Sequence, residues 1–122
     1  MRIFVETRAF TNRLPDFLDD LAFRRLQNEL GAHPQKGQVI PGCAGLRKVR
    51  VADESRGKGK RGGARVVYLD VPEVECIHLV TIYGKDAQDD LTPDQKRFFA
   101  QLARQVRTEA LRAVRLRGER SV

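Results

Sequence analysis

The run CIHLVTIY, from Cys76 to Tyr83, constrains the fold more than any other stretch of this chain. It is nearly continuously apolar. A strand with one face in water alternates apolar and polar residues, whereas a continuous apolar run is typical of a strand buried on both faces. We therefore expect residues 76–83 to form a central strand of a sheet.

Three further runs are strand-like, namely Ile3–Val5, Leu46–Ala52 and Ala64–Val71. Their β-branched residues favour extended backbone. The short segment Val71–Glu75 contains a proline and joins the last of these runs to the apolar run. This spacing predicts an antiparallel hairpin.

Two helical regions complete the pattern. Within Ala9–Leu30, apolar residues recur at helical spacing and predict one buried stripe. The members of this stripe are Leu18, Leu21, Ala22, Leu26 and Leu30. Near the C-terminus, Thr92-Pro93-Asp94-Gln95 is a capping-box sequence, with Thr92 at the N-cap and Gln95 three residues later. We expect this helix to fray into a basic tail at about residues 112–122.

The order of these elements predicts an α+β fold in a single domain spanning residues 1–122. The expected architecture is a small, mostly antiparallel sheet, with the N-terminal helices and the C-terminal helix packed on one of its faces. The length suits one domain. No apolar run is long enough to cross a bilayer, and the N-terminus lacks the apolar core of a signal peptide. We therefore expect a cytoplasmic protein with no membrane partner.

Metal and cofactor sites are not expected. The two cysteines, Cys43 and Cys76, lack the spacing of a zinc site. No cluster of carboxylates suggests a metal ion either.

Positive charge is concentrated in one part of the sequence. The formal net charge is +7, and residues 47–65 contribute eight basic residues against Asp53 and Glu54, a net +6. The basic residues are Arg47, Lys48, Arg50, Arg56, Lys58, Lys60, Arg61 and Arg65. Such a local concentration predicts an anionic partner.

The stretch Gly57–Gly62 within this region matches the pattern G-x-G-x-x-G. A dinucleotide-binding loop needs a helix directly after the glycines, because the helix N-terminus holds the pyrophosphate. Here a strand-like run follows, which argues against a cofactor loop. The cations between the glycines instead suit a flexible loop that docks on a phosphodiester backbone. The alternative is a hairpin loop that is charged only for solubility.

The strands that flank this loop also carry cations. Alternation places Lys48 and Arg50 on the same face of their strand. If the loop closes a hairpin, Arg65 lies across from them, and three cations converge on one site. Arginine binds phosphate with a planar fork and lysine with a compact charge. The alternative is a surface strand whose charges point outward.

Three segments resemble those of the RelE/HigB-like toxins, in the family order and with the family spacing. They are VIPGCAGLRKVR at 39–50, GKGKRGGARVVY at 57–68, and TIYGK at 81–85 followed by DDLT at 89–92. The resemblance is to the HigB-type branch and covers residues 4–106. It implies a ribosome-dependent mRNA endonuclease, the toxin of a type II toxin–antitoxin pair. Its partners would be mRNA on the ribosome, with contacts to 16S rRNA, and a HigA-like helix-turn-helix antitoxin.

The resemblance also implies roles for individual residues. The implied catalytic residues are Lys48, Arg50, Arg65, Tyr83 and Lys85. The implied RNA- and ribosome-binding residues are Arg47, Lys58, Lys60, Arg61 and Tyr68. The chemistry would be attack of the RNA 2′-OH on the adjacent phosphate. On this interpretation Arg65→Ala abolishes toxicity and leaves the fold intact.

The catalytic roles follow from that chemistry. Arg50 and Arg65 would stabilise charge on the phosphate oxygens. Lys48 or Lys85 would serve as general base. Tyr83 would stack on a base or deliver a proton to the leaving group.

The sequence departs from RelE itself at two points. RelE has an arginine after its last lysine, where this chain has Asp86. RelE also uses a tyrosine in its C-terminal segment, where this chain has Phe98 and Phe99. Two other functions stay open. One is a non-enzymatic RNA- or ribosome-binding module, and the other is a ParE-type gyrase poison that shares the fold.

Overall fold

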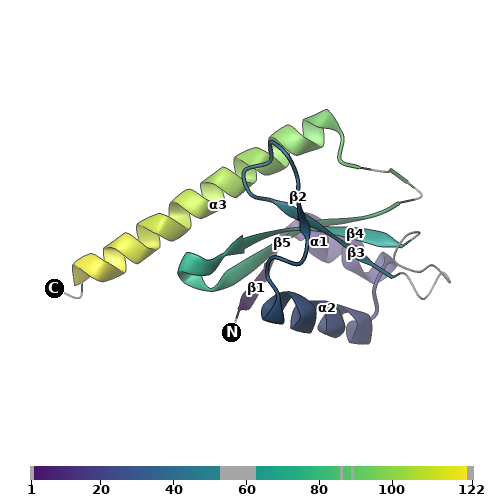
Figure 1. Cartoon of the computed structure of the whole chain (residues 1–122), viewed down its shortest axis with the longest axis horizontal. Helices are drawn as coiled ribbons and strands as arrows, with labels where there is room; N and C mark the ends of the chain where they lie inside the picture. Colours follow the sequence, from purple (N-terminus) through teal and green to yellow (C-terminus); the bar gives the residue numbers. More distant parts are fainter. Residues whose placement is uncertain (1, 53–62, 86, 89, 121–122) are drawn as a thin grey trace.

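The computed structural model describes residues 2–52, 63–85, 87, 88 and 90–120. The fold is α+β, as the sequence predicts (Figure 1). In chain order its elements are β1 Ile3–Glu6, α1 Arg8–Arg13, the 3₁₀ helix η1 Leu14–Asp16, α2 Asp20–Ala32, β2 Gln38–Val39, β3 Arg47–Val51, β4 Ala64–Val71, the 3₁₀ helix η3 Pro72–Val74, β5 Cys76–Gly84 and α3 Pro93–Arg120.

The sheet has five strands in the order β1-β5-β4-β3-β2. β1 runs parallel to β5, and the other neighbours are antiparallel. The apolar run is confirmed as an interior strand, because β5 lies between β1 and β4 and is buried over most of its length. The hairpin of β4 and β5 is confirmed as well. Its turn contains Glu75 in the left-handed conformation, with φ 54°.

Helices cover both faces of the sheet, and the expectation that they share one face is wrong. α2 lies on one side of the sheet and α3 on the other (Figure 1). Successive residues of β5 show the two cores: Leu79 belongs to the cluster that holds Phe10 of α1, and Val80 to the cluster that holds Phe99 of α3. Because side chains alternate along a strand, two adjacent apolar residues require cover on both sides.

The helix α2 buries a narrower stripe than the sequence suggests. Leu26 and Leu30 are buried against the sheet, whereas Leu21 is 55% exposed. Leu21 lies about 100° around the helix from Ala22, which is enough to turn it toward solvent. The helix begins at an N-cap, Asp19, whose carboxylate accepts a hydrogen bond from the Ala22 N–H at 2.8 Å.

The C-terminal helix α3 starts where the sequence predicts. The Thr92 Oγ1 accepts a hydrogen bond from the Gln95 N–H at 3.1 Å, and the Gln95 side chain accepts one from the Thr92 N–H at 2.9 Å. The expected frayed tail is wrong, because α3 continues to Arg120. Residues 111–118 are all exposed, and most of them are good helix formers. Among the helices described, none combines the length and apolarity needed to span a membrane.

Candidate functional site

Three of the predicted catalytic residues form one row across the sheet. Arg50 of β3 is paired with Arg65 of β4, and Arg65 is paired with Tyr83 of β5. Directly opposite residues share a face and have Cβ atoms about 5 Å apart. The expected convergence of Arg50 and Arg65 is therefore confirmed, and Lys48 lies two residues along β3 on the same face.

This row runs from the surface into the interior on the α3 side of the sheet. Arg50 is exposed, whereas Arg65 is 5% exposed and Tyr83 is 3% exposed. One guanidinium nitrogen of Arg65, Nη1, donates to the Ala64 carbonyl oxygen at 3.2 Å. Removing so buried a side chain leaves a cavity and costs stability, so the fold of Arg65→Ala stays a prediction.

The Tyr83 hydroxyl is the inner end of the row. It is buried, and no group among the described residues forms a hydrogen bond with it. The pKa of Tyr83 is raised to about 12, mainly by burial and also by the negative charge of Asp90, whereas the positive charge of Arg65 opposes the rise. Tyr83 is therefore a neutral phenol at physiological pH, able to donate a proton.

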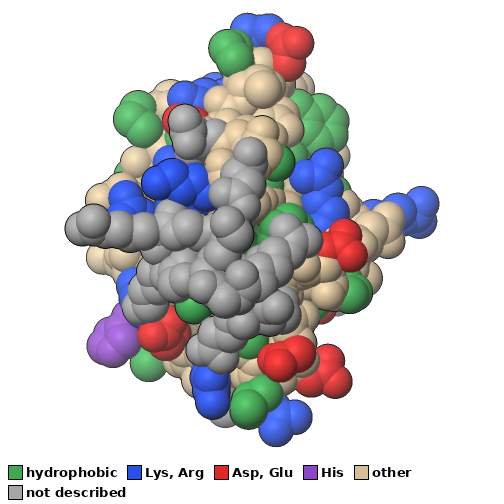
Figure 2. Space-filling view, turned by 90° about the vertical axis from the view of Figure 1, so that its right-hand side faces the viewer, with side chains coloured by type: hydrophobic (Ala, Val, Ile, Leu, Met, Phe, Trp, Pro, Cys, Tyr) green, Lys and Arg blue, Asp and Glu red, His purple; other side chains and the backbone are tan. Residues whose placement is uncertain are grey.

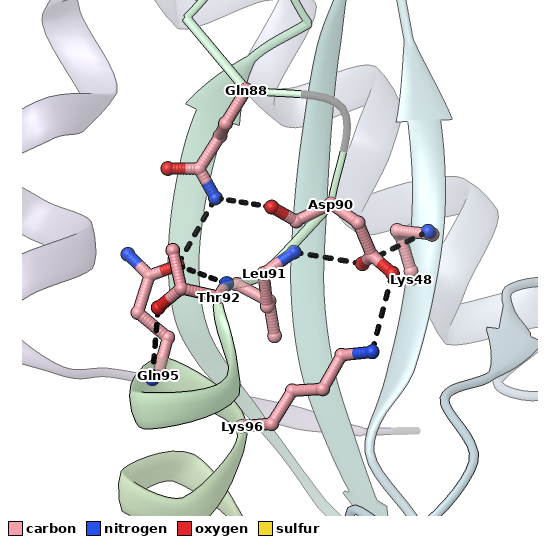
Figure 3. Close-up of polar contacts among 7 residues, drawn as sticks. All are labelled: Lys48, Gln88, Asp90, Leu91, Thr92, Gln95 and Lys96. Carbon is pink, nitrogen blue, oxygen red and sulfur yellow. Dashed lines mark hydrogen bonds and ion pairs between the residues drawn. The ribbon is translucent and has the colours of Figure 1, made fainter.

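Lys48 contacts a carboxylate that comes from the segment before α3. Its Nζ lies 3.4 Å from Asp90 Oδ1, and the Nζ of Lys96 lies 3.4 Å from Asp90 Oδ2 (Figure 3). Neither Asp90 nor Lys96 is predicted from the sequence to be a site residue. The Lys48–Asp90 contact joins positions 42 residues apart, and no local pattern reveals such a pairing.

The environment of Asp90 favours its charged form. Desolvation opposes ionisation, but the Leu91 N–H and the charges of Lys48 and Lys96 outweigh it, so the pKa of Asp90 is lowered. The Leu91 N–H donates to Asp90 Oδ1 at 2.8 Å. A carboxylate therefore lies among two ammonium groups and one amide donor beside the row of Arg50, Arg65 and Tyr83.

Arg47 and Tyr68, both predicted to bind RNA, make hydrogen bonds to the segment before β2, and for the partly exposed Arg47 RNA binding stays a prediction. The Tyr68 hydroxyl donates to the Pro34 carbonyl and accepts from the Gly37 N–H, both at 2.8 Å, and its ring is fully buried. Arg47 Nη1 donates to the Gly37 carbonyl at 2.8 Å. Burial raises the pKa of Tyr68. Tyr68 has no exposed surface to offer to RNA in this fold, so we assign it a structural role.

Of the remaining predicted residues, the structure describes Lys85. Lys85 is exposed just after β5, and its backbone N–H donates to the Gly63 carbonyl at 3.1 Å. Lys58, Lys60 and Arg61 lie outside the described residues. Figure 2 shows the face of the molecule on the right-hand side of Figure 1, where several lysine and arginine side chains are at the surface. A shallow hollow beside β2 and β3 adds Lys36 to Lys48 and Arg50.

The part of the chain that the structure describes offers no grouping of three His, Cys, Asp or Glu side chains that would hold a metal ion. The glycine pattern does not lead into a helix either, because β4 begins at Ala64. The ionisable side chains of the row and its surroundings are cations, the Tyr83 phenol and the Asp90 carboxylate. Cationic side chains can bind an anion, and a phenol can donate a proton.

Comparison with known proteins identifies the fold. No protein-family model matches the chain. A mutant of the Escherichia coli toxin RelE in the free state matches with a TM-score of 0.52 at 13% identity, covering 72% of this chain and 87% of that one. The isolated E. coli RelE toxin matches with a TM-score of 0.51 at 12% identity, covering 69% and 84%. This chain has the RelE fold.

A third match with the RelE fold comes from a complex. The intact E. coli RelBE toxin–antitoxin complex matches with a TM-score of 0.50 at 13% identity, covering 67% of this chain and 94% of that one. The RelE fold therefore accounts for most of each solved chain and about two thirds or more of this one. Within it, the row of Arg50, Arg65 and Tyr83 spans three adjacent strands of the sheet.

Proposed function

We propose that this protein is the toxin of a type II toxin–antitoxin pair and cuts mRNA on the ribosome. The proposal includes the HigB-type branch and the cytoplasm as the place of action. Three independent features support it. They are the RelE fold, the three sequence segments that resemble the RelE/HigB-like toxins, and the row of Arg50, Arg65 and Tyr83.

The row is the observation that carries the proposal. Like charges directly opposite each other on a sheet repel, and the positive site they create attracts an anion. Arg50 is exposed and therefore accessible to a large ligand such as RNA. A phosphate at Arg50 would lie beside Lys48 and close to Arg65, where the row becomes buried.

The proposed reaction is a transesterification within RNA. The 2′-oxygen loses its proton to a base and bonds to the adjacent phosphorus, and the bond to the 5′-oxygen breaks as that oxygen takes up a proton. The products are a cyclic phosphate and a free 5′-OH. Arg50 and Arg65 stabilise the negative charge that builds up on the phosphate oxygens. Lys48 and Lys85 are the candidate bases.

We assign Tyr83 the role of general acid, which gives a proton to the leaving 5′-oxygen. A phenol with a pKa of about 12 holds its proton at neutral pH, which suits a general acid and not a general base. The other aromatic residues near the start of α3 are Phe98 and Phe99, which carry no exchangeable proton. Tyr83 thus replaces the C-terminal tyrosine of RelE in this proposal.

The partners follow from the same proposal. The matched RelBE structure is a toxin–antitoxin complex. We assign this chain a HigA-like antitoxin with a helix-turn-helix, and contacts to 16S rRNA through its basic end. Lys58, Lys60 and Arg61 remain candidate RNA-binding residues.

The test is induced expression in bacteria followed by primer extension on a reporter mRNA. We expect new 5′ ends within codons for the wild type. Arg50→Ala should lower cleavage about 100-fold, because one well-placed donor to a charged transition state is worth that much. Arg50 is exposed, so its removal should not affect folding, which circular dichroism of the purified variant would verify.

The matched control is Arg24→Ala, on the exposed surface of α2. It makes the same chemical change away from the row and should cleave like the wild type. Equal cleavage by Arg50→Ala and Arg24→Ala would overturn the assigned site. DNA damage with intact mRNA would indicate a gyrase poison, and salt-dependent RNA binding without cleavage would indicate a binding module.

A further inference from the structure

A carboxylate occupies the place beside the row where a phosphate would be expected. Asp90 lies between β5 and α3, and its two oxygens face Lys48 of β3 and Lys96 of α3 (Figure 3). The Leu91 N–H adds a third donor at 2.8 Å. Two ammonium groups and an amide N–H from separate elements are the donors that recurrently hold phosphate oxygens in proteins.

Asp90 is held weakly by the two lysines. Both Nζ–carboxylate distances are 3.4 Å, longer than the roughly 2.8 Å of a strong charge-assisted hydrogen bond. The Asp90 side chain is 45% exposed. Exposed ion pairs contribute little free energy, so a competing anion can displace the carboxylate.

The helix does not need Asp90 as its cap. Thr92 and Gln95 satisfy each other's backbone N–H groups, which completes the start of α3. Among the described residues, the Asp90 carboxylate accepts one backbone hydrogen bond, from the Leu91 N–H, and its other partners are the two lysines. An asparagine at this position can still accept that bond, so the charge and the structural role of Asp90 are separable.

The place of Asp90 ties it to the row. Its negative charge reaches the Tyr83 hydroxyl, which is buried without a hydrogen-bond partner among the described residues. Lys48, its other neighbour, lies two residues from Arg50 on the same face. A phosphate in place of the carboxylate would thus contact Lys48, on the strand face that also carries Arg50, and its charge would act on Tyr83.

We infer that Asp90 is a resident anion in a phosphate site formed by Lys48, Lys96 and the Leu91 N–H, and that Lys96 binds the RNA backbone once RNA displaces it. This inference rests on the proposed function for the identity of its ligand. Asp90 acts as a competitor of the substrate, and Lys96 is a further substrate-binding residue.

The experiment measures binding of a short 2′-O-methyl RNA by fluorescence anisotropy over a range of salt concentrations. The probe lacks the free 2′-OH, so it cannot be cut. Asp90→Asn should tighten binding roughly two- to fivefold, the range expected from removing a weak ion pair. The slope of log binding constant against log salt concentration should also become steeper, by about 0.7 for each lysine that becomes free to bind a phosphate.

The matched control is Asp94→Asn, which removes the same charge from an exposed aspartate in the first turn of α3. Asp94 pairs with Arg97 and contacts neither lysine of the site. Equal tightening by both variants would reduce the effect to net charge and overturn the inference. Weaker or unchanged binding by Asp90→Asn would overturn it as well.

Lys96→Ala supplies the second arm. It should weaken RNA binding more in the Asp90→Asn background than in the wild type, because Asp90 then no longer occupies Lys96. The same loss in both backgrounds would exclude Lys96 from the site. If the wild type leaves reporter mRNA uncut while Asp90→Asn still tightens RNA binding, only the proposed nuclease function is overturned. If the wild type cuts mRNA but Asp90→Asn does not tighten binding, only the inference about Asp90 is overturned.

Discussion

Tyr68 and Tyr83 are both buried in the sheet, but their hydroxyl groups have opposite surroundings. The Tyr68 hydroxyl makes two hydrogen bonds of 2.8 Å to the segment before β2. The Tyr83 hydroxyl makes none within the described part of the chain. A buried polar group without a partner costs about 1–3 kcal/mol, whereas a satisfied one contributes to stability.

Replacing each tyrosine by phenylalanine should therefore change stability in opposite directions. Tyr68→Phe should lower the free energy of unfolding by about 1–3 kcal/mol, because the Gly37 N–H and the Pro34 carbonyl lose their partner. Tyr83→Phe should raise it by about 1 kcal/mol. Urea unfolding of the three proteins would measure both changes, and a destabilised Tyr83→Phe would show that its hydroxyl has a partner.

The pH dependence of the same variants gives an independent check. The pKa of Tyr83 is raised to about 12 from an ordinary value of 10. A raised pKa means that the folded state binds the proton more tightly. Its contribution to stability is then complete below pH 10 and declines between pH 10 and 12. Tyr83→Phe should lose less stability over this interval than the wild type.

The sequence predicts which residues alternate on a strand, but it does not predict their surroundings. The pairing of Arg50 with Arg65 follows from strand alternation and a hairpin. The burial of Arg65 does not, because strand alternation does not say what packs over a residue. Tyr68 was assigned to RNA for the same reason, since a strand tyrosine has the same local pattern whether it binds a ligand or its own backbone.

The start of α3 is the element that the sequence describes most completely. Thr92 and Gln95 make the reciprocal hydrogen bonds that their spacing predicts. The signal is local, because both partners lie within one turn. By contrast, β2 is only two residues long and lies in a segment that reads as a connection. It forms only because β3 is available beside it.

Removing the cap should destabilise the protein through α3. Thr92→Ala leaves the Gln95 N–H without its acceptor and should lower the free energy of unfolding by about 0.5–2 kcal/mol. Thr108→Ala is the control, since Thr108 is exposed in the middle of the same helix and alanine favours helix. Thermal unfolding followed by circular dichroism compares the two. Equal stability of both variants would show that the capping box contributes nothing.

For the whole molecule, cover on both faces of the sheet is the main difference from expectation. A continuous apolar run indicates that a strand is buried on both sides, but it does not say which helix lies on which side. The apolar run of β5 already required two layers of cover. The single-face arrangement did not satisfy that requirement. The register of β5 with β1 and β4 leaves both faces of this strand to be filled by helices.

Three leucines test this two-sided core. Leu79 lies in the cluster facing α1 and α2, Leu69 lies in the cluster facing α3, and both are almost completely buried. Leu79→Ala and Leu69→Ala should each cost about 2–5 kcal/mol. Leu21→Ala, at a position that is 55% exposed, should change stability by no more than about 0.5 kcal/mol. Tolerance of Leu69→Ala in urea unfolding would contradict a core on the α3 side.

The parallel pairing of β1 with β5 has a consequence for the order in which the protein is completed during its synthesis. Ile3 pairs with Cys76 and Glu6 pairs with Leu79. At ordinary rates of translation, β5 is therefore synthesised several seconds after β1, and β1 cannot pair before then. The row of Arg50, Arg65 and Tyr83 depends on the same strand. A nascent chain that has not yet released β5 has neither a closed sheet nor a complete row. Until β5 is available, the ribosome that makes this protein therefore carries a nascent chain in which the row is not yet assembled.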